Sequence, residues 1–394
     1  MSAARADVPP GRRTASLLEL ARLFLRLGVT AFGGPAVHIA MMEDEVVRRR
    51  PWLTREQFLD FLGATNLIPG PNSTEMAIHI GFVRAGWPGL LVAGLSFIVP
   101  AALIVGAIAW VYVRFGTLVQ AEALLYGVKP VAVAIVAQAL VRLARTAVRS
   151  WTLALVAAAC VVAAAAGVHE LILLPAAGGV MAASALVRRP GGMARHGLAV
   201  CAAGAATTTL AAQAAVPATP VGLWPIFLVF AKAGALLYGS GYVLFAFLRA
   251  DLVERYRWLT EAELIDAIAI GQVTPGPLFT TATFVGYVLG GTPGAAIATA
   301  GIFLPAFVFV ALMGPIVPRL RRSAAAGAAL DGVNAAALAL MTVVSWQLGR
   351  TALVDPLTVA LAAISLFALV RFRVNSAWLI AAGGLAGLAT WALA

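Results

Sequence analysis

The sequence is poor in the residues from which enzyme and metal sites are usually built. Its 394 residues include four histidines and two cysteines, Cys160 and Cys201, and both cysteines lie in apolar segments. This argues against a disulfide framework or a thiolate metal site, and we expect the cysteines to be small packing residues. The chain has no Gly-x-Ser-x-Gly, no phosphate-binding loop ending in Gly-Lys-Ser/Thr and no His-Glu-x-x-His. We therefore expect no enzyme, no metal and no cofactor.

Charged residues are also scarce, at 11% of the chain, whereas 61% of the residues are hydrophobic. The mean hydropathy is +0.93. These values predict a helical protein that crosses a membrane several times, with the lipid bilayer as its main partner. The net charge of +11 comes from short clusters between apolar runs, which favours topology signals over nucleic-acid binding. We expect no cleavable signal peptide, because residues 1–16 are polar and the first apolar segment carries Glu19, Arg22 and Arg26.

Two Pro-Gly-Pro segments interrupt the apolar part of the chain, at Pro69-Gly70-Pro71 and Pro275-Gly276-Pro277. Proline removes a backbone donor, glycine permits unusual backbone angles, and the second proline suits the first turn of a new helix. We therefore expect new helices to begin at Asn72 or Ser73 and at Leu278 or the residue after it. Irregular backbone inside a membrane lines a cavity or is buried in protein, and two such breaks in matching places indicate the binding site of a transporter.

The second half of the sequence repeats the first. With a shift of 206 residues, 14 of the 48 positions from 24 to 71 are identical to those from 230 to 277. A shift of 205 residues continues the match as far as Gly127-Val128 and Gly332-Val333. The identities include rare residues in register, such as Trp52-Leu53-Thr54 with Trp258-Leu259-Thr260. A biased composition would not preserve them, so the chain is an internal duplication.

The positions of the basic clusters predict that the two repeats are inverted. The front module of each repeat consists of the broken helix and the Pro-Gly-Pro pair. If each front module crosses the membrane an even number of times, all basic clusters lie in the cytoplasm. This predicts an all-α polytopic protein with about 13 spans, or nearer nine if the hairpins are re-entrant. The N-terminus would be cytoplasmic and the C-terminus periplasmic. The expected parts are a disordered tail (1–16), an N-terminal repeat (17–190), a linker span (191–220) and a C-terminal repeat (221–394).

The backbone breaks are the first candidates for substrate contact. New helices after the two Pro-Gly-Pro segments present positive dipole ends and free N–H groups, which suit an anion, and nearby hydroxyls add donors. A second pair of breaks, at 33–35 and 239–241, is expected to face the first. The alternative is that all four breaks only bend helices around their neighbours. The candidate residues are Gly33, Gly34, Pro35, Gly70, Pro71, Asn72, Ser73, Thr74, Gly239, Ser240, Gly241, Gly276, Pro277 and Thr280.

Two cations occupy equivalent positions in the repeats, Arg26 and Lys232. A charge within an apolar helix usually faces a cavity or a partner, so we expect both to attract an anion; snorkelling to the headgroups is the alternative. Glu75 and His79 lie four residues apart on one face of a helix. They are candidates for proton coupling, and the alternative is a local ion pair that stabilises the helix.

The arguments for other polar residues are weaker. Lys129 is a third candidate cation, but it has no cationic counterpart in the second repeat. Asp60 and Asp266 recur before each Pro-Gly-Pro, where we expect capping or pairing with a nearby arginine. His38 follows the first break, and its counterpart is Leu244, which argues against a role in binding.

The chain resembles the long-chain type of the chromate ion transporter superfamily over residues 17–394. The resemblance rests on Phe32-Gly33-Gly34-Pro35, Trp52-Leu53-Thr54, Pro69-Gly70-Pro71-Asn72-Ser73-Thr74-Glu75, Tyr238-Gly239-Ser240-Gly241-Tyr242 and Gln272-Val273-Thr274-Pro275-Gly276-Pro277. It implies efflux of chromate, a tetrahedral dianion similar to sulfate, through the bacterial inner membrane by two homologous domains in antiparallel orientation. The matching motif positions are Gly33, Gly34, Pro35, Pro69, Gly70, Pro71, Asn72, Gly239, Gly241, Pro275, Gly276 and Pro277.

Residues and resemblance together predict a secondary transporter that exports chromate and confers chromate resistance. Because the chain has no ATP site, we expect an ion gradient to drive it. The residues do not separate chromate from sulfate, so sulfate or another small anion is the alternative substrate. A passive anion channel is the alternative mechanism, and a membrane scaffold would leave the duplicated breaks without a purpose. A homodimer is compatible with the sequence.

Overall fold

The computed structural model describes residues 16–32, 34–116, 119–187, 221–238, 241–313, 323–372 and 374–393. Within these ranges the protein is helical and contains no β-strand. Several predicted features lie outside the described residues. They are the N-terminal tail apart from Ser16, the linker span at 191–220, and the candidate site residues Gly33, Gly239 and Ser240.

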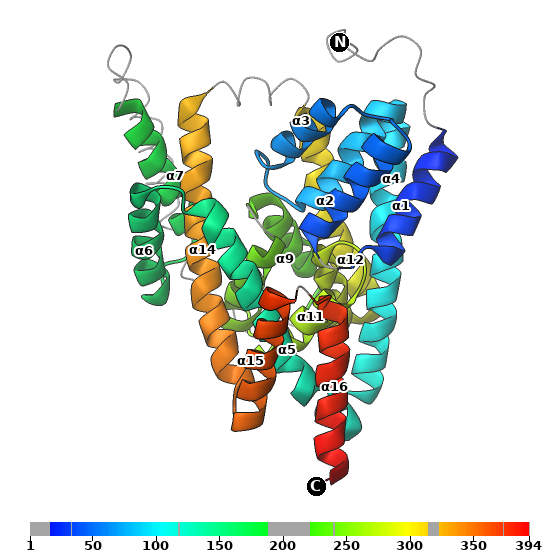
Figure 1. Cartoon of the computed structure of the whole chain (residues 1–394), viewed down its shortest axis with the longest axis vertical. Helices are drawn as coiled ribbons and strands as arrows, with labels where there is room; N and C mark the ends of the chain where they lie inside the picture. Colours follow the sequence, from blue (N-terminus) through cyan, green and yellow to red (C-terminus); the bar gives the residue numbers. More distant parts are fainter. Residues whose placement is uncertain are drawn as a thin grey trace.

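The two repeats fold into matching series of helices (Figure 1). The first repeat contains α1 (Leu17–Thr30), α2 (Pro35–Glu43), the π-helix η2 (Asp44–Arg49), α3 (Arg55–Thr65), α4 (Asn72–Phe115), α5 (Val119–Ala147), α6 (Trp151–Ala165) and α7 (Glu170–Val187). The second contains α9 (Leu223–Leu236), η3 (Gly241–Val243), α10 (Leu244–Leu248), the π-helix η4 (Arg249–Arg255), α11 (Glu261–Val273), η5 (Leu278–Thr280), α12 (Thr281–Met313), α14 (Ala324–Ala352), α15 (Pro356–Arg371) and α16 (Ser376–Leu393). With a shift of 206 residues α1 corresponds to α9 and α3 to α11, and with a shift of 205 residues α5 corresponds to α14 and α7 to α16.

The repeated Trp-Leu-Thr motif forms the same turn in both repeats. The amides of its Trp and Leu donate to one carbonyl of the preceding π-helix, that of Val46 in the first repeat (2.8 and 3.1 Å) and Leu252 in the second (2.7 and 3.1 Å). The threonine, Thr54 or Thr260, then caps the next helix, and each forms a capping box with the residue three positions on. The duplicated residues therefore fix where α3 and α11 begin.

Each repeat also contains one long helix that is kinked at the same place. The backbone is non-helical at Ala85 and Gly86 in α4, and the equivalent kink in α12 ends at Gly291. Both kink glycines have a left-handed φ, 64° and 61°, which glycine adopts without strain. A Cβ on Gly81 would overlap the carbonyl of Gly89 across the kink, and the equivalent glycines of α12 make the same contact. Each long helix is therefore a hairpin with tightly packed legs.

The two repeats are interlocked rather than side by side. Helices α6 and α7 of the first repeat pack on α14 of the second, whereas α15 and α16 of the second pack on α5 of the first. Small residues permit this approach: a Cβ on Gly332 of α14 would meet the carbonyl of Ala177 in α7, and one on Gly387 of α16 would meet that of Ala123 in α5. In Figure 1, α7 ends near the top of the view and its equivalent, α16, runs to the bottom.

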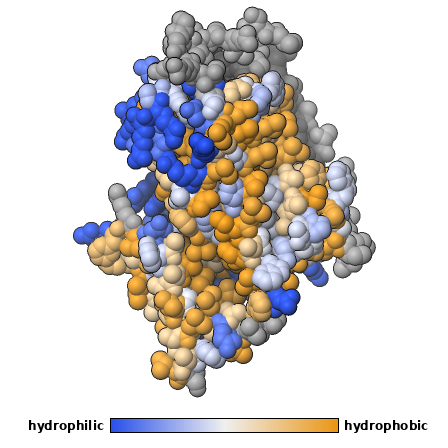
Figure 2. Space-filling view, turned by 90° about the vertical axis from the view of Figure 1, so that its right-hand side faces the viewer, coloured by the Kyte–Doolittle hydropathy of each residue, from blue (hydrophilic) through white to orange (hydrophobic). Residues whose placement is uncertain are grey.

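The outer surface is apolar, as a lipid-facing surface must be. Five of the described helices are long and apolar enough to cross a membrane: Asn72–Phe115, Val119–Arg145, Leu278–Leu312, Ala325–Ala352 and Ser376–Leu393. Helices α6, α7, α9 and α15 are shorter and also apolar. Large hydrophobic side chains such as Leu95, Leu103 and Trp110 on α4 are exposed. Figure 2 shows a mainly hydrophobic face whose hydrophilic residues gather at the upper left. The chain is thus a multi-pass membrane protein, while the count of about 13 spans stays a prediction.

Candidate functional site

A small cavity lies where the breaks of the two repeats meet, and we call it the inter-repeat cavity. Its volume is about 50 Å³. The first repeat lines it with Pro35, Ile39, Pro71, Asn72 and Ser73, and the second with Gly241, Pro277, Leu278 and Phe279. The structure therefore brings together candidate residues from all four breaks: Pro35, Pro71, Asn72 and Ser73 from the first repeat, and Gly241 and Pro277 from the second.

The glycines of the two Pro-Gly-Pro segments join the repeats instead of lining the cavity. The amide of Gly70 donates to the carbonyl of Leu237 (2.7 Å), and that of Gly276 donates to the carbonyl of Ala31 (2.9 Å). The two acceptors are equivalent residues, directly after α9 and α1. Both glycines have positive φ, 136° and 86°. Each break is thus held by the helix end of the other repeat.

Helices begin at this cavity, as the prolines predict. Helix α4 starts at Asn72, directly after Pro71, and η5 starts at Leu278, directly after Pro277. The first amides of a helix have no acceptor within that helix, and its dipole places positive potential at this end. The two starts differ in their side chains, because Asn72 and Ser73 are polar whereas Leu278 and Phe279 are apolar. The cavity therefore has one polar and one apolar wall.

A buried histidine stands behind the polar wall. The ring of His38 is 1% exposed. Its Nε2 lies 3.0 Å from the carbonyl oxygen of Ala31, and its Nδ1 lies 3.3 Å from Oγ of Ser73. The edge of Phe97 packs against the ring, with 5.6 Å between centroids. The sequence argument set His38 aside because its counterpart is Leu244, yet His38 contacts a side chain that lines the cavity.

Asn72 lines the cavity, whereas the candidates Thr74 and Thr280 are not among its lining residues. The side-chain amide of Asn72 donates to the side-chain oxygen of Asn66 (2.7 Å). The hydroxyl of Thr280 donates to the carbonyl of Pro277 (2.8 Å). Thr74 is fully buried, and its hydroxyl has no hydrogen-bond partner among the described residues.

The two equivalent cations do not line the inter-repeat cavity; each forms an ion pair with an acidic residue of the following π-helix. Arg26 pairs with Glu45 of η2, and Lys232 pairs with Asp251 of η4. Positions 45 and 251 are themselves equivalent at the shift of 206 residues. This recurrence of acid with base was visible in the sequence and would have predicted the pairing.

The surroundings of the two pairs differ. Glu45 also contacts Arg49 and Arg50, at 3.2 Å each, and the Arg26 side chain is half-exposed beside a surface cavity of about 640 Å³. Lys232 instead has a second carboxylate, Glu170 at the start of α7, at 3.7 Å. Both carboxylates are therefore buried, but the Arg26 end of the first pair is exposed and its surroundings are rich in cations, whereas the second pair is rich in carboxylates.

Glu75 and His79 do not pair with each other in the described structure. Glu75 is fully buried, and neither of its carboxylate oxygens has a hydrogen-bond partner among the described residues. Its carboxyl group lies against Gly70, where a Cβ would overlap it. His79 stacks on Phe61, with 5.7 Å between ring centroids. The local ion pair is thus not formed.

Asp266 has a lysine as its cationic partner, where an arginine was expected. Its carboxylate contacts Nζ of Lys129 (3.2 Å) and accepts a hydrogen bond from Tyr112 (2.9 Å). These residues line a cavity of about 440 Å³, separate from the inter-repeat cavity. Lys129 is therefore neutralised by a carboxylate in this structure.

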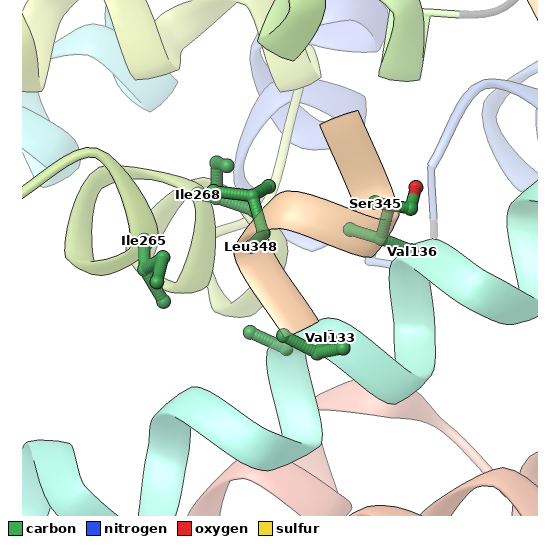
Figure 3. A pocket seen from close by; sticks show the side chains of 7 residues that line it. Val133, Val136, Ile265, Ile268, Ser345 and Leu348 are labelled. Atoms are coloured by element: carbon green, nitrogen blue, oxygen red, sulfur yellow. The ribbon is translucent and has the colours of Figure 1, made fainter. Parts of the chain in front are cut away.

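Two further findings narrow the choice of site. A pocket between α5, α11 and α14 has a volume of about 10 Å³, and aliphatic side chains line it apart from Ser345 (Figure 3). It is too small and too apolar for an anion.

No cluster of metal-ligating residues occurs in the part of the chain that the structure describes. Cys160 is buried, and Cys201 lies outside the described residues.

Comparisons with known proteins agree on one family. A family profile described as "Chromate transporter" matches residues 18–184 and 224–388, which are the two repeats. The chain is 34% identical to the chromate transport protein of Cupriavidus metallidurans over 389 residues, covering 96% of this chain and 94% of that protein. It is 34% identical to the chromate transport protein of Pseudomonas aeruginosa over 394 residues, covering 96% and 93%. The probable chromate transport protein of Synechococcus elongatus is 30% identical, with 95% and 96% covered. No solved structure matches the chain.

Proposed function

The chain belongs to the chromate transporter family, and on this premise we propose that it exports chromate across the bacterial inner membrane as a secondary transporter. The observation that carries the proposal is the inter-repeat cavity, where two helices begin and where residues of both repeats meet. Broken helices at a repeat interface form the substrate sites of many secondary transporters.

The chemistry of the cavity suits a small oxyanion. The amino end of α4 supplies backbone donors and positive potential, and Asn72 and Ser73 supply polar side chains. Among the described residues that line the cavity, no side chain is charged. Binding by dipoles and neutral donors is modest, which lets a transported anion leave. We propose that Arg26 and Lys232 act on the anion at longer range while they remain paired with their carboxylates.

Glu75 and His79 remain our proposed groups for proton coupling. A fully buried carboxylate without a partner is costly in its charged form, which supports a proton on Glu75 in this state. Its position behind Gly70 places that proton next to one of the two contacts that join the repeats.

The outward direction agrees with simple energetics. Moving one charge through 100 mV involves about 2.3 kcal/mol, so an inside-negative potential favours export of a dianion by about 4.6 kcal/mol per 100 mV.

Alternating access would come from rocking of one repeat module against the other. The opposite directions of α7 and α16 support inverted repeats, with the N-terminus in the cytoplasm and the C-terminus in the periplasm.

Two alternatives remain distinct in what they predict. Sulfate has the charge and shape of chromate, so the cavity supports either substrate. A passive channel needs a continuous wet path, whereas a cavity of about 50 Å³ between buried helix starts supports a carrier.

The test is flux of radiolabelled chromate into or out of liposomes that hold the purified protein and a set membrane potential. Wild type should give saturable flux that follows the potential. Ser73→Ala removes a donor to a charged ligand, worth about 1.5–3 kcal/mol, and should weaken binding about tenfold or more. Thr342→Ala, which removes a hydroxyl bonded to its own helix on α14, is the matched control. No flux by folded protein would refute a chromate carrier, and flux that never saturates would favour the channel.

A further inference from the structure

The hydrogen bonds of His38 fix the direction of its proton. The carbonyl of Ala31 accepts only, so Nε2 at 3.0 Å must carry a hydrogen. A neutral imidazole has one N–H, so Nδ1 is an acceptor. The hydroxyl of Ser73, 3.3 Å away, then donates to the ring. While His38 is neutral, the Ser73 proton points away from the inter-repeat cavity.

Protonation of His38 would reverse this bond. An imidazolium donates from both nitrogens, so Nδ1 would donate to Oγ of Ser73. The hydroxyl hydrogen would be released and free to donate to an oxygen of an anion in the cavity. The same step would place a positive charge directly behind Ser73. One proton thus changes the Ser73 hydroxyl, as seen from the cavity, from an acceptor of hydrogen bonds to a donor.

The burial of His38 makes proton and anion depend on each other. The ring is 1% exposed, and a charged imidazolium in such a place is costly unless an opposite charge compensates it. The elements packed against the ring are the end of α1 and helix α4, and its contacts there are Ala31, Ser73 and Phe97. None of the ion pairs between described residues involves His38. The titratable and charged groups on α1, α2 and α4 are Glu19, Arg22, Arg26, Glu43, Glu75, His79, Arg84, Tyr112 and Arg114.

We infer that His38 couples the uptake of one proton to the binding of an anion in the inter-repeat cavity, with Ser73 as the side chain that transmits the change. The inference rests on the proposed function. It adds a side chain that lies within hydrogen-bond distance of a lining side chain, whereas the carboxylate of Glu75 has no hydrogen-bond partner among the described residues. The second repeat has Leu244 and Phe279 at the equivalent positions, so the device exists on one side only. A dianion with one proton still carries one negative charge, which an inside-negative potential moves outward by about 2.3 kcal/mol per 100 mV.

The experiment counts protons taken up on chromate binding. Purified protein is titrated with chromate in calorimetry, in buffers of different ionisation enthalpy, between about pH 6 and pH 8. Burial lowers the pKa of His38 below this range, so the ring is neutral before the anion binds. The His38→Gln variant keeps the neutral pattern, because an amide donates to Ala31 and accepts from Ser73, but it cannot gain a proton. Since chromate itself takes up protons equally in both titrations, the difference between wild type and variant reports His38.

The expected difference is up to about one proton per anion, so the affinity ratio of wild type to variant should change by up to about tenfold per pH unit. His169→Gln, which changes a histidine that contacts Glu170 and is not among the lining residues, should take up as many protons as wild type. If the His38→Gln variant fails to fold, Ser73→Ala gives the second test and should take up fewer protons than wild type. Equal proton uptake in wild type and variant overturns the inference and leaves the transporter standing. Absence of chromate binding by folded wild type overturns both.

Discussion

Replacement of Lys232 should damage the protein far more than replacement of its repeat equivalent, Arg26. Lys232 is the cation recorded for two buried carboxylates, Asp251 at 1% exposed and Glu170 at 4%. Lys232→Ala leaves Asp251 without a cationic partner among the described residues and leaves Glu170 with only the His169 ring, whose Nδ1 lies 3.3 Å from the carboxylate. Breaking a buried pair on one side costs about 3–5 kcal/mol. Arg26→Ala acts on a half-exposed side chain, so the expected cost is about 0–1 kcal/mol.

The two variants should differ in stability because Glu45 and Asp251 keep different numbers of cationic partners. After loss of Arg26, Glu45 retains Arg49 and Arg50, each at 3.2 Å. After loss of Lys232, Asp251 keeps no recorded hydrogen-bond donor among the described residues. The double variant Lys232→Ala with Asp251→Asn removes one of the stranded charges, so it should recover part of the lost stability.

Thermal unfolding in one detergent, together with the folded fraction after size exclusion, measures these changes. Lys232→Ala should unfold at a clearly lower temperature than Arg26→Ala, and the double variant should lie between Lys232→Ala and wild type. Equal losses for the two single variants would refute the reasoning, because they would show that the cations remaining near each carboxylate do not decide the cost. A double variant less stable than Lys232→Ala would contradict it in the same way.

Three further predictions use the same assays. Gly276→Ala should lower the stability of the folded protein by about 1–3 kcal/mol and should impair transport, because the backbone would be strained. The φ of Gly276 is 86°, and a Cβ there would lie 2.9 Å from a carbonyl oxygen. The control is Gly106→Ala, where a Cβ has no neighbour nearer than 4.0 Å. Tyr112→Phe removes a 2.9 Å hydrogen bond to the carboxylate of Asp266 and should cost about 1.5–3 kcal/mol, and an unchanged melting temperature would contradict this. Burial raises the pKa of Glu45, but hydrogen bonds from neighbouring arginines lower it further, to below its ordinary value. The charged Glu45 therefore stabilises the folded protein above its ordinary pKa, and this stabilisation is lost as the pH falls through the lower pKa of the folded state. Glu45→Gln should be less stable than wild type at neutral pH, and the two stabilities should become equal in acid.

Local backbone signals predicted the helix starts well. Proline and glycine act on the residues next to them, so the starts at Asn72 and Leu278 follow from the Pro-Gly-Pro segments alone. The kinks of the two long helices likewise lie at glycines, Gly86 and Gly291. These features need no knowledge of distant contacts.

Features that depend on distant contacts were not predicted. Packing of α7 on α14 and of α16 on α5 joins segments far apart in the chain, and small residues on a helix do not say which helix they will meet. The prediction for Arg26 and Lys232 was attraction of an anion, with snorkelling to the headgroups as the alternative, whereas both form ion pairs with acidic residues of the next π-helices. His38 was discounted because the second repeat lacks it, yet the two walls of the cavity differ for that same reason.

The reciprocal bonds from Gly70 to Leu237 and from Gly276 to Ala31 affect how the protein must be made. A ribosome finishes the first repeat before Leu237 and α14 exist, so that repeat waits in the membrane with an unpaired amide and with α7 lacking its partner. Chaperones and proteases of the membrane therefore meet an incomplete intermediate during every round of synthesis. A cell that produced the two repeats from separate genes would have to deliver them together and in equal amounts.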